Sequence, residues 1–232
     1  MRRWIIALLT IGAGVGAVAF AGAHEVSLAI SPADAAIVDR LALPPVRPTP
    51  ARGVREEIAV ILAVQDHILS AAPINRGIPE GRPRELPDLI RIGYGLCFDR
   101  SRAIETVLRA RGFETRHAAI YSTAETGSAL ESFATPRTES HAVTEVKTAA
   151  GWLLVDSNQR WIGLTADGRP IDLIELRQSN NLQWHPMVKD ALPYIYTRPF
   201  TWAYGLYSRH GRFYPPYNAV PDVNWSELMH NL

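Results

Sequence analysis

The sequence has only one cysteine, Cys97, among its 232 residues, so it cannot form an internal disulfide. It has no surplus of either charge: the formal net charge is +1 and the arginines are scattered, which gives no electrostatic case for nucleic acid as a partner. The histidines are far apart and neither HExxH nor CxxC spacing occurs, so the sequence predicts no metal site and implies no cofactor. A hydrophobic fraction of 47% with 20% charged residues is typical of a globular domain.

The N-terminus has the pattern of an export segment. Met1-Arg2-Arg3 is a basic head, and Trp4 to Ala23 is an uncharged, largely apolar run of about 20 residues, long enough to span a bilayer. Ala21-Gly22-Ala23 supplies the small residues of a signal-peptidase site. We therefore expect residues 1–23 to be a signal peptide, with an uncleaved membrane anchor as the alternative. Because the positive residues stay inside, both predict an exported domain, periplasmic or anchored to the cytoplasmic membrane and facing outward.

The rest of the chain divides by composition into three parts. Residues 24–53 are predicted to be a proline-rich linker, irregular from Pro32 to Pro50. Residues 54–180 form the expected domain, which opens with apolar residues at helical spacing from Val54 until Pro73 ends the helix. Residues 181–232 are an aromatic-rich extension that we expect to pack on the domain without regular structure, because prolines recur through it.

A second helix is predicted from Cys97 to about Arg111. The turn Gly93-Tyr94-Gly95 precedes it, and Gly112 is a natural stop at its far end. Ile104 falls on the same helical stripe as Cys97, as expected for a face that packs on a core. A thiol at a helix N-terminus faces unpaired backbone N–H groups and the positive end of the helix dipole, and both favour the thiolate.

Three strand-like runs follow this helix, at residues 115–121, 141–147 and 152–156. The polar stretch from Ser122 to Ser140 is expected to be a mobile loop. The last two runs are close enough in the sequence to form an antiparallel hairpin. The sequence therefore predicts a mixed fold in which the helix beginning at Cys97 lies against an antiparallel sheet.

The register of that hairpin decides which side chains meet. If Thr148 to Gly151 form a four-residue loop, Lys147 opposes Trp152, and Asp156 lies diagonally beside His141 on the same face. A shift of one residue would put the two on opposite faces. A pairing of His141 with Asp156 therefore requires an even offset, and the simplest loop provides one.

Three ordered motifs resemble those of the transglutaminase-like superfamily. Gly95-Leu96-Cys97-Phe98-Asp99 at a helix start resembles its cysteine motif, the run from His141 to Val146 its histidine strand, and Gly151 to Ser157 its aspartate strand. The resemblance covers roughly residues 55 to 165 and suggests a bacterial exported member. It implies an α+β, papain-like core in which the helix carrying the cysteine packs against an antiparallel sheet. The family includes transglutaminases, cysteine peptidases, amidases and members that have lost catalysis.

Carried over to this chain, the resemblance implies that Cys97 is the nucleophile, His141 its base and Asp156 the group that orients the imidazole. The thiolate would attack an amide carbonyl of a protein or peptide and release the amine. Water would then complete hydrolysis, which we rank above cross-linking to a lysine amine. The backbone N–H of Cys97 is one expected oxyanion donor, and Tyr94 and Asn75 are candidates for the second.

Other interpretations of the same residues remain open. A lone cysteine on an apolar helix is often a small buried side chain, and Asp156 has a residue type that commonly begins a turn. His117 is the alternative base if His141 is misassigned. Val143 stands where family members often carry a tryptophan, which weakens any transfer of substrate specificity. The order and spacing of all three motifs favour the catalytic interpretation.

The aromatic-rich extension suggests an alternative function. Large rings recur from Trp184 onward among prolines and arginines. Packing across the domain is the favoured role, since exposed rings on that scale would invite aggregation without a partner. The alternative is a non-catalytic transglutaminase-like domain whose rings bind an envelope polysaccharide or peptide. A cell-envelope polymer is the partner expected under this alternative, whereas the enzyme hypothesis expects a protein or peptide amide.

Overall fold

The computed structural model describes residues 22, 24–44, 53–79, 81–179, 181–207 and 222–232. The predicted signal peptide or anchor, apart from Gly22, and the end of the proline-rich stretch lie outside these ranges. Within them, no helix combines the length and the apolarity that crossing a membrane requires.

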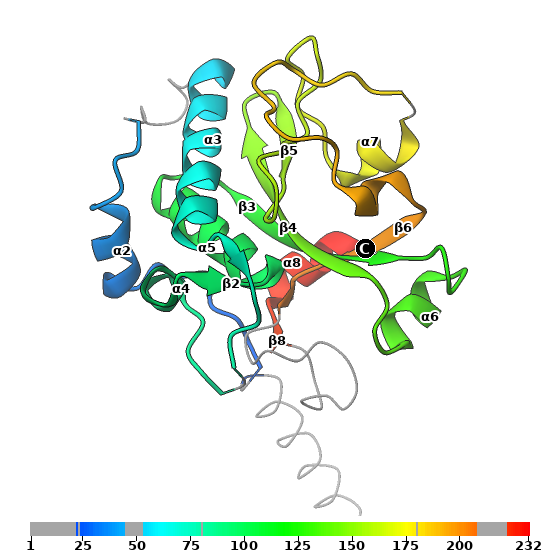
Figure 1. The fold of residues 1–232 in the computed structure, drawn as a ribbon, viewed down its shortest axis with the longest axis horizontal. Helices are drawn as coiled ribbons and strands as arrows, with labels where there is room; N and C mark the ends of the chain where they lie inside the picture. Colours follow the sequence, from blue (N-terminus) through cyan, green and yellow to red (C-terminus); the bar gives the residue numbers. More distant parts are fainter. Residues whose placement is uncertain (1–21, 23, 45–52, 80, 180, 208–221) are drawn as a thin grey trace, which may run out of the picture.

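An antiparallel sheet of four strands forms the centre of the fold, in the order β5-β4-β3-β6 (Figure 1). Its strands are β3 (Thr115–Ser122), β4 (Ser140–Thr148), β5 (Gly151–Val155) and β6 (Phe200–Tyr204). Every residue of β3 is buried, because the strand lies in the interior of the sheet and both of its faces are covered. The combination of this sheet with packed helices is the α+β, papain-like architecture that the sequence predicts.

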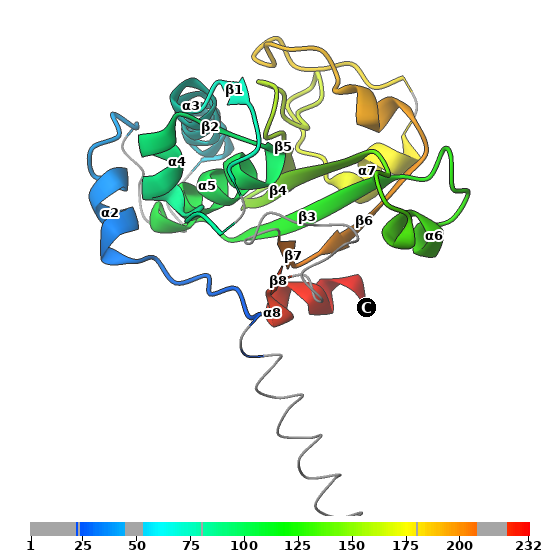
Figure 2. The ribbon, with the colours of Figure 1, turned by 60° about the horizontal axis from the view of Figure 1, so that its bottom comes forward.

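The first group of helices covers one face of the sheet. It contains α3 (Val54–Ala71), α4 (Leu86–Ile92) and α5 (Cys97–Ala110), which Figures 1 and 2 show gathered on one side. Ile104 of α5 packs in the same buried cluster as Val146 of β4. The two long helices lie where their apolar spacing predicts them, since that spacing is what this core requires.

Part of the C-terminal half of the chain packs on the other face. A second buried cluster surrounds Trp161 and includes Tyr196 and Phe200, together with Leu173 at the start of α7 (Leu173–Gln178). The expectation that the aromatic extension lacks regular structure is wrong for β6, which pairs with β3 from Ser122↔Phe200 to Ala118↔Tyr204. Pro199 comes directly before this strand and does not interrupt it, and proline is compatible with that position.

Two segments that were expected to be irregular contain short helices. α2 (Pro32–Val38) lies within the predicted linker, and its N-cap Ser31 forms a reciprocal capping box with Asp34. α6 (Ala129–Ala134) lies within the predicted mobile loop, and the Ser128 hydroxyl accepts the backbone N–H of Glu131. Both expectations are corrected, because side-chain caps specify a helix even where the composition is typical of a loop.

The remaining elements are short. Two parallel strands, β1 (Ile74–Asn75) and β2 (Tyr94–Gly95), lie beside the start of α5. An antiparallel pair, β7 (Leu206–Tyr207) and β8 (Asp222–Val223), leads into α8 (Trp225–Leu228). Two 3-10 helices complete the list, η1 (Tyr194–Thr197) and η2 (Met229–Asn231).

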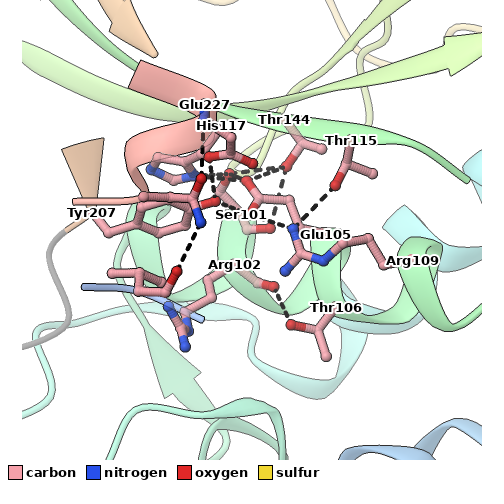
Figure 3. Close-up of polar contacts among 12 residues, drawn as sticks. Ser101, Arg102, Glu105, Thr106, Arg109, Thr115, His117, Thr144, Tyr207 and Glu227 are labelled. Atoms are coloured by element: carbon pink, nitrogen blue, oxygen red, sulfur yellow. Dashed lines mark hydrogen bonds and ion pairs between the residues drawn. The ribbon is translucent and has the colours of Figure 1, made fainter. Parts of the chain in front are cut away.

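A buried polar network joins α5 to the C-terminal elements (Figure 3). Glu105 of α5 lies 2.6 Å from His117 Nδ1 of β3, and the Tyr207 hydroxyl lies 3.0 Å from the same carboxyl group. The Tyr207 ring stacks on the His117 ring at 4.1 Å, and its hydroxyl also contacts Glu227 of α8 at 2.7 Å. These contacts connect residues about a hundred positions apart and make the C-terminus part of the core.

Candidate active site

The start of α5 is fixed by a small set of contacts. Asp99 Oδ2 accepts the backbone N–H of Leu96 at 2.9 Å, and Arg84 donates to Asp99 Oδ1 at 2.8 Å. Gly95 is required at its position, because a Cβ there would lie 2.7 Å from Leu89 Cδ1 and 2.9 Å from Asp99 Cβ. Cys97, the first residue of the helix, is half-buried. Its thiol therefore stands at a rigid helix N-terminus and remains reachable from solvent.

The hairpin register agrees with the predicted offset. Lys147 pairs with Trp152, as expected, although the loop is tighter because Thr148 and Gly151 also pair. His141 Nε2 lies 2.7 Å from Asp156 Oδ2. Since the carboxylate can only accept, the imidazole donates from Nε2, which leaves Nδ1 as the nitrogen available to the thiol.

Asp156 is surrounded by donors. Its Oδ1 accepts the backbone N–H groups of Asn158 at 2.7 Å and Gln159 at 2.8 Å. Its Oδ2 also accepts the Tyr196 hydroxyl at 2.9 Å. The carboxylate is fully buried, so these donors replace water in stabilising its charge. Tyr196 lies in the aromatic extension and carries no motif, so sequence reasoning missed it.

Gln65 of α3 is a second residue that the sequence did not identify. Its buried Nε2 lies within 3.0 Å of three backbone carbonyls, those of Asp156, Gln159 and Trp161. These carbonyls belong to the turn that follows β5. Gln65 thus attaches the turn that presents Asp156 to the helix layer, and only the three-dimensional contact reveals that role.

The charges of the site favour an ion pair between the thiol and the imidazole. Burial alone would raise the pKa of the Cys97 thiol, but the hydrogen bond and positive charge of His141, with backbone groups of Ala142 and Phe98, lower it below its usual value. Burial opposes protonation of His141, yet Asp156 and Cys97 raise the pKa of that imidazole to about 10. Despite its burial, the pKa of Asp156 is lowered by His141 and by backbone donors. A thiolate beside an imidazolium is a reactive nucleophile.

Two cavities lie beside the side chains of Cys97, His141 and Asp156. The larger, of about 380 Å³, is lined by Cys97, His141, Asn75 and Asn158, among other residues. The smaller, of about 170 Å³, is lined by His141, Asn158 and Tyr194, among other residues. His141 and Asn158 border both cavities.

His117, the alternative base, lies away from both cavities. It is completely buried, its Nδ1 contacts Glu105, and it lines neither cavity. In the described part of the chain, no three side chains of the metal-binding types gather into a group that could hold a metal ion.

A family model and a solved structure match this chain. Residues 49–157 match the model of the transglutaminase-like superfamily. A search of curated proteins found no match. One similar solved structure is a protein of Parabacteroides distasonis ATCC 8503, provisionally described as a protease. It shares 16% identity and a TM-score of 0.33, and the match spans 60% of this chain and 26% of that one. The domain match supports a cysteine-type enzyme.

Proposed function

We propose that the chain is a cysteine-dependent acyl-transfer enzyme in which Cys97, His141 and Asp156 form a catalytic triad. One observation carries the proposal: the 2.7 Å contact between His141 and Asp156 stands beside a thiol that borders an open cavity. A buried structural cysteine would need neither the oriented imidazole nor the cavity. The lowered pKa of the Cys97 thiol agrees with a nucleophile.

The reaction follows from the charges of the three groups. The Cys97 thiolate attacks the carbonyl carbon of an amide, a C–S bond forms, and the carbonyl electron pair moves to oxygen. Collapse of this oxyanion breaks the C–N bond, and the His141 imidazolium gives its proton to the departing amine. In the second half, His141 takes a proton from water, which attacks the thioester and restores the thiolate while releasing the acid. Asp156 holds the ring in one tautomer throughout.

The proposed substrate is an amide of a protein or peptide in the cell envelope. The basic head and apolar run of residues 1–23 support an exported location, and the two cavities suit an extended chain. We rank hydrolysis above cross-linking, because no motif marks a site for a lysine donor. Among the described rings of the aromatic extension, Tyr196, Phe200, Tyr204 and Tyr207 are buried and only Tyr194 and Trp225 stand out, at 64% and 42% exposure. A stacking platform for a polysaccharide is therefore the weaker hypothesis.

The test is turnover of a mixture of acyl peptides by the purified protein, read by mass spectrometry with and without an added primary amine. Hydrolysis adds the elements of water across the cleaved bond, whereas transfer yields a conjugate with the amine. Cys97→Ala should abolish both products, and Gln178→Ala, an exposed amide on α7, serves as the control. Product formation that survives in Cys97→Ala would reject the proposed mechanism.

A further inference from the structure

A buried arginine beside the triad has no role in the mechanism above. Arg100, one turn along α5 from Cys97, is only 2% exposed. Its Nη2 donates to Asn75 Oδ1 at 2.6 Å and to Asn158 Oδ1 at 2.8 Å. A single nitrogen thus holds two side-chain amides, both of which line the larger cavity.

The chemistry of arginine fixes the orientation of both amides. A guanidinium has only donors, so each asparagine must turn its oxygen toward Arg100 and its NH₂ group away from it. Asn75 and Asn158 are both exposed, and both line the cavity that contains Cys97. Neither NH₂ group has a hydrogen-bond partner elsewhere in the described chain. Two oriented donors are therefore available to a molecule in this cavity.

The backbone pairing of β1 with β2 places Asn75 beside the start of α5. Strand β1 pairs with β2 so that Asn75 lies opposite Gly95, two residues before Cys97. Tyr94, the other candidate for the second oxyanion donor, packs its ring against the core and under the Arg76 guanidinium at 5.0 Å, and it does not line the cavity.

We propose that the Asn75 amide is the second oxyanion donor and that Arg100, anchored also by Asn158, is the residue that positions it. The inference rests on the proposed acyl-transfer function. When the carbonyl carbon becomes tetrahedral, its oxygen gains a negative charge that two oriented N–H groups stabilise. Arg100 is bound to the asparagine oxygens and supplies no donor to the substrate itself.

The test compares two reagents for the same thiol. Iodoacetamide alkylates a thiolate by displacement at a saturated carbon and develops no oxyanion, whereas p-nitrophenyl acetate acylates it through a tetrahedral oxyanion. We expect Asn75→Ala to lower the acylation rate about 100-fold, the usual effect of removing one oxyanion donor. The alkylation rate and its pH dependence should stay near wild type. Asn75→Asp should also lower the acylation rate, because it keeps the oxygen facing Arg100 but loses the donor.

Two further variants complete the design. Arg100→Lys keeps the positive charge near the thiolate but cannot hold two amides in one plane, so acylation should fall by a smaller factor while alkylation is retained. Gln178→Ala is the exposed-amide control. An unchanged ratio of acylation to alkylation in Asn75→Ala would overturn the role of Asn75 and would leave the proposed function untouched. Wild-type protein that p-nitrophenyl acetate fails to acylate would instead refute the proposed function.

Discussion

Substitution of Glu227 by glutamine should stabilise the protein at neutral pH and above. The Tyr207 hydroxyl contacts carboxylate oxygens of both Glu105, at 3.0 Å, and Glu227, at 2.7 Å. A hydroxyl has one hydrogen, so it can donate to only one of them, and the other contact needs a protonated carboxyl. His117 and Arg109 flank Glu105 and, despite its burial, lower its pKa. The proton therefore belongs on Glu227.

The magnitude follows from the pKa of Glu227. Burial, and then the charge of Glu105, raise this pKa from 4.5 to about 7. A carboxyl whose folded pKa exceeds its unfolded pKa binds more protons in the native state, so stability falls as the pH rises from about 4.5 to 7. At about 1.4 kcal/mol per pKa unit, the loss is on the order of 3 kcal/mol above pH 7. Glutamine stays neutral and can donate to Tyr207, which removes this loss.

The assay is urea unfolding followed by tryptophan fluorescence at several pH values between 4.5 and 8. The free energy of unfolding of Glu227→Gln should exceed that of the wild type by about 3 kcal/mol at pH 8 and should approach it at pH 4.5. Glu131→Gln, at an exposed carboxyl on α6, is the matched control and should follow the wild type. Parallel pH dependences for wild type and Glu227→Gln would refute the reasoning.

Two more substitutions test how the site is held. Tyr196→Phe removes a donor from Asp156 Oδ2, so it should destabilise the fold by about 1 kcal/mol in urea unfolding and lower the acylation rate; an unchanged rate would show that this hydroxyl does not support the triad. Gly95→Ala forces a Cβ to 2.7 Å from Leu89 Cδ1 and should cost about 1–3 kcal/mol in thermal unfolding. Gly77→Ala, whose Cβ would meet its nearest atom at 3.6 Å, is the control, and equal melting temperatures for the two would contradict the close packing at Gly95.

The sequence predicts the parts of this structure that depend on short-range patterns. Helical spacing locates α3 and α5, and alternation with a short turn sets the register that brings His141 to Asp156. The register is readable because the hairpin is local, so only the turn length had to be judged. The helix that begins at Cys97 can be predicted from the sequence for the same reason, because its pattern is also local.

Contacts between distant segments account for what the sequence could not predict. Tyr196 reaches Asp156 from 40 positions away, and Gln65 reaches the same turn from 91 positions away. A tyrosine or glutamine has no local pattern that marks such a contact. Strand β6 was missed because its partner, β3, is far away in the sequence, and the surrounding prolines suggested irregular structure. Long-range pairing overrides local composition in these cases.

The pH dependence of Cys97 alkylation by iodoacetamide tests the central claim most directly, in wild type and in His141→Ala. The account predicts that the wild-type thiol reacts with an apparent pKa well below the roughly 8.5 of a free thiol, because the imidazolium stabilises the thiolate. Loss of the imidazole should move that apparent pKa upward, since burial then acts without compensation. A wild-type thiol that titrates at or above the free value, or a profile identical in His141→Ala, would contradict the proposed thiolate–imidazolium pair.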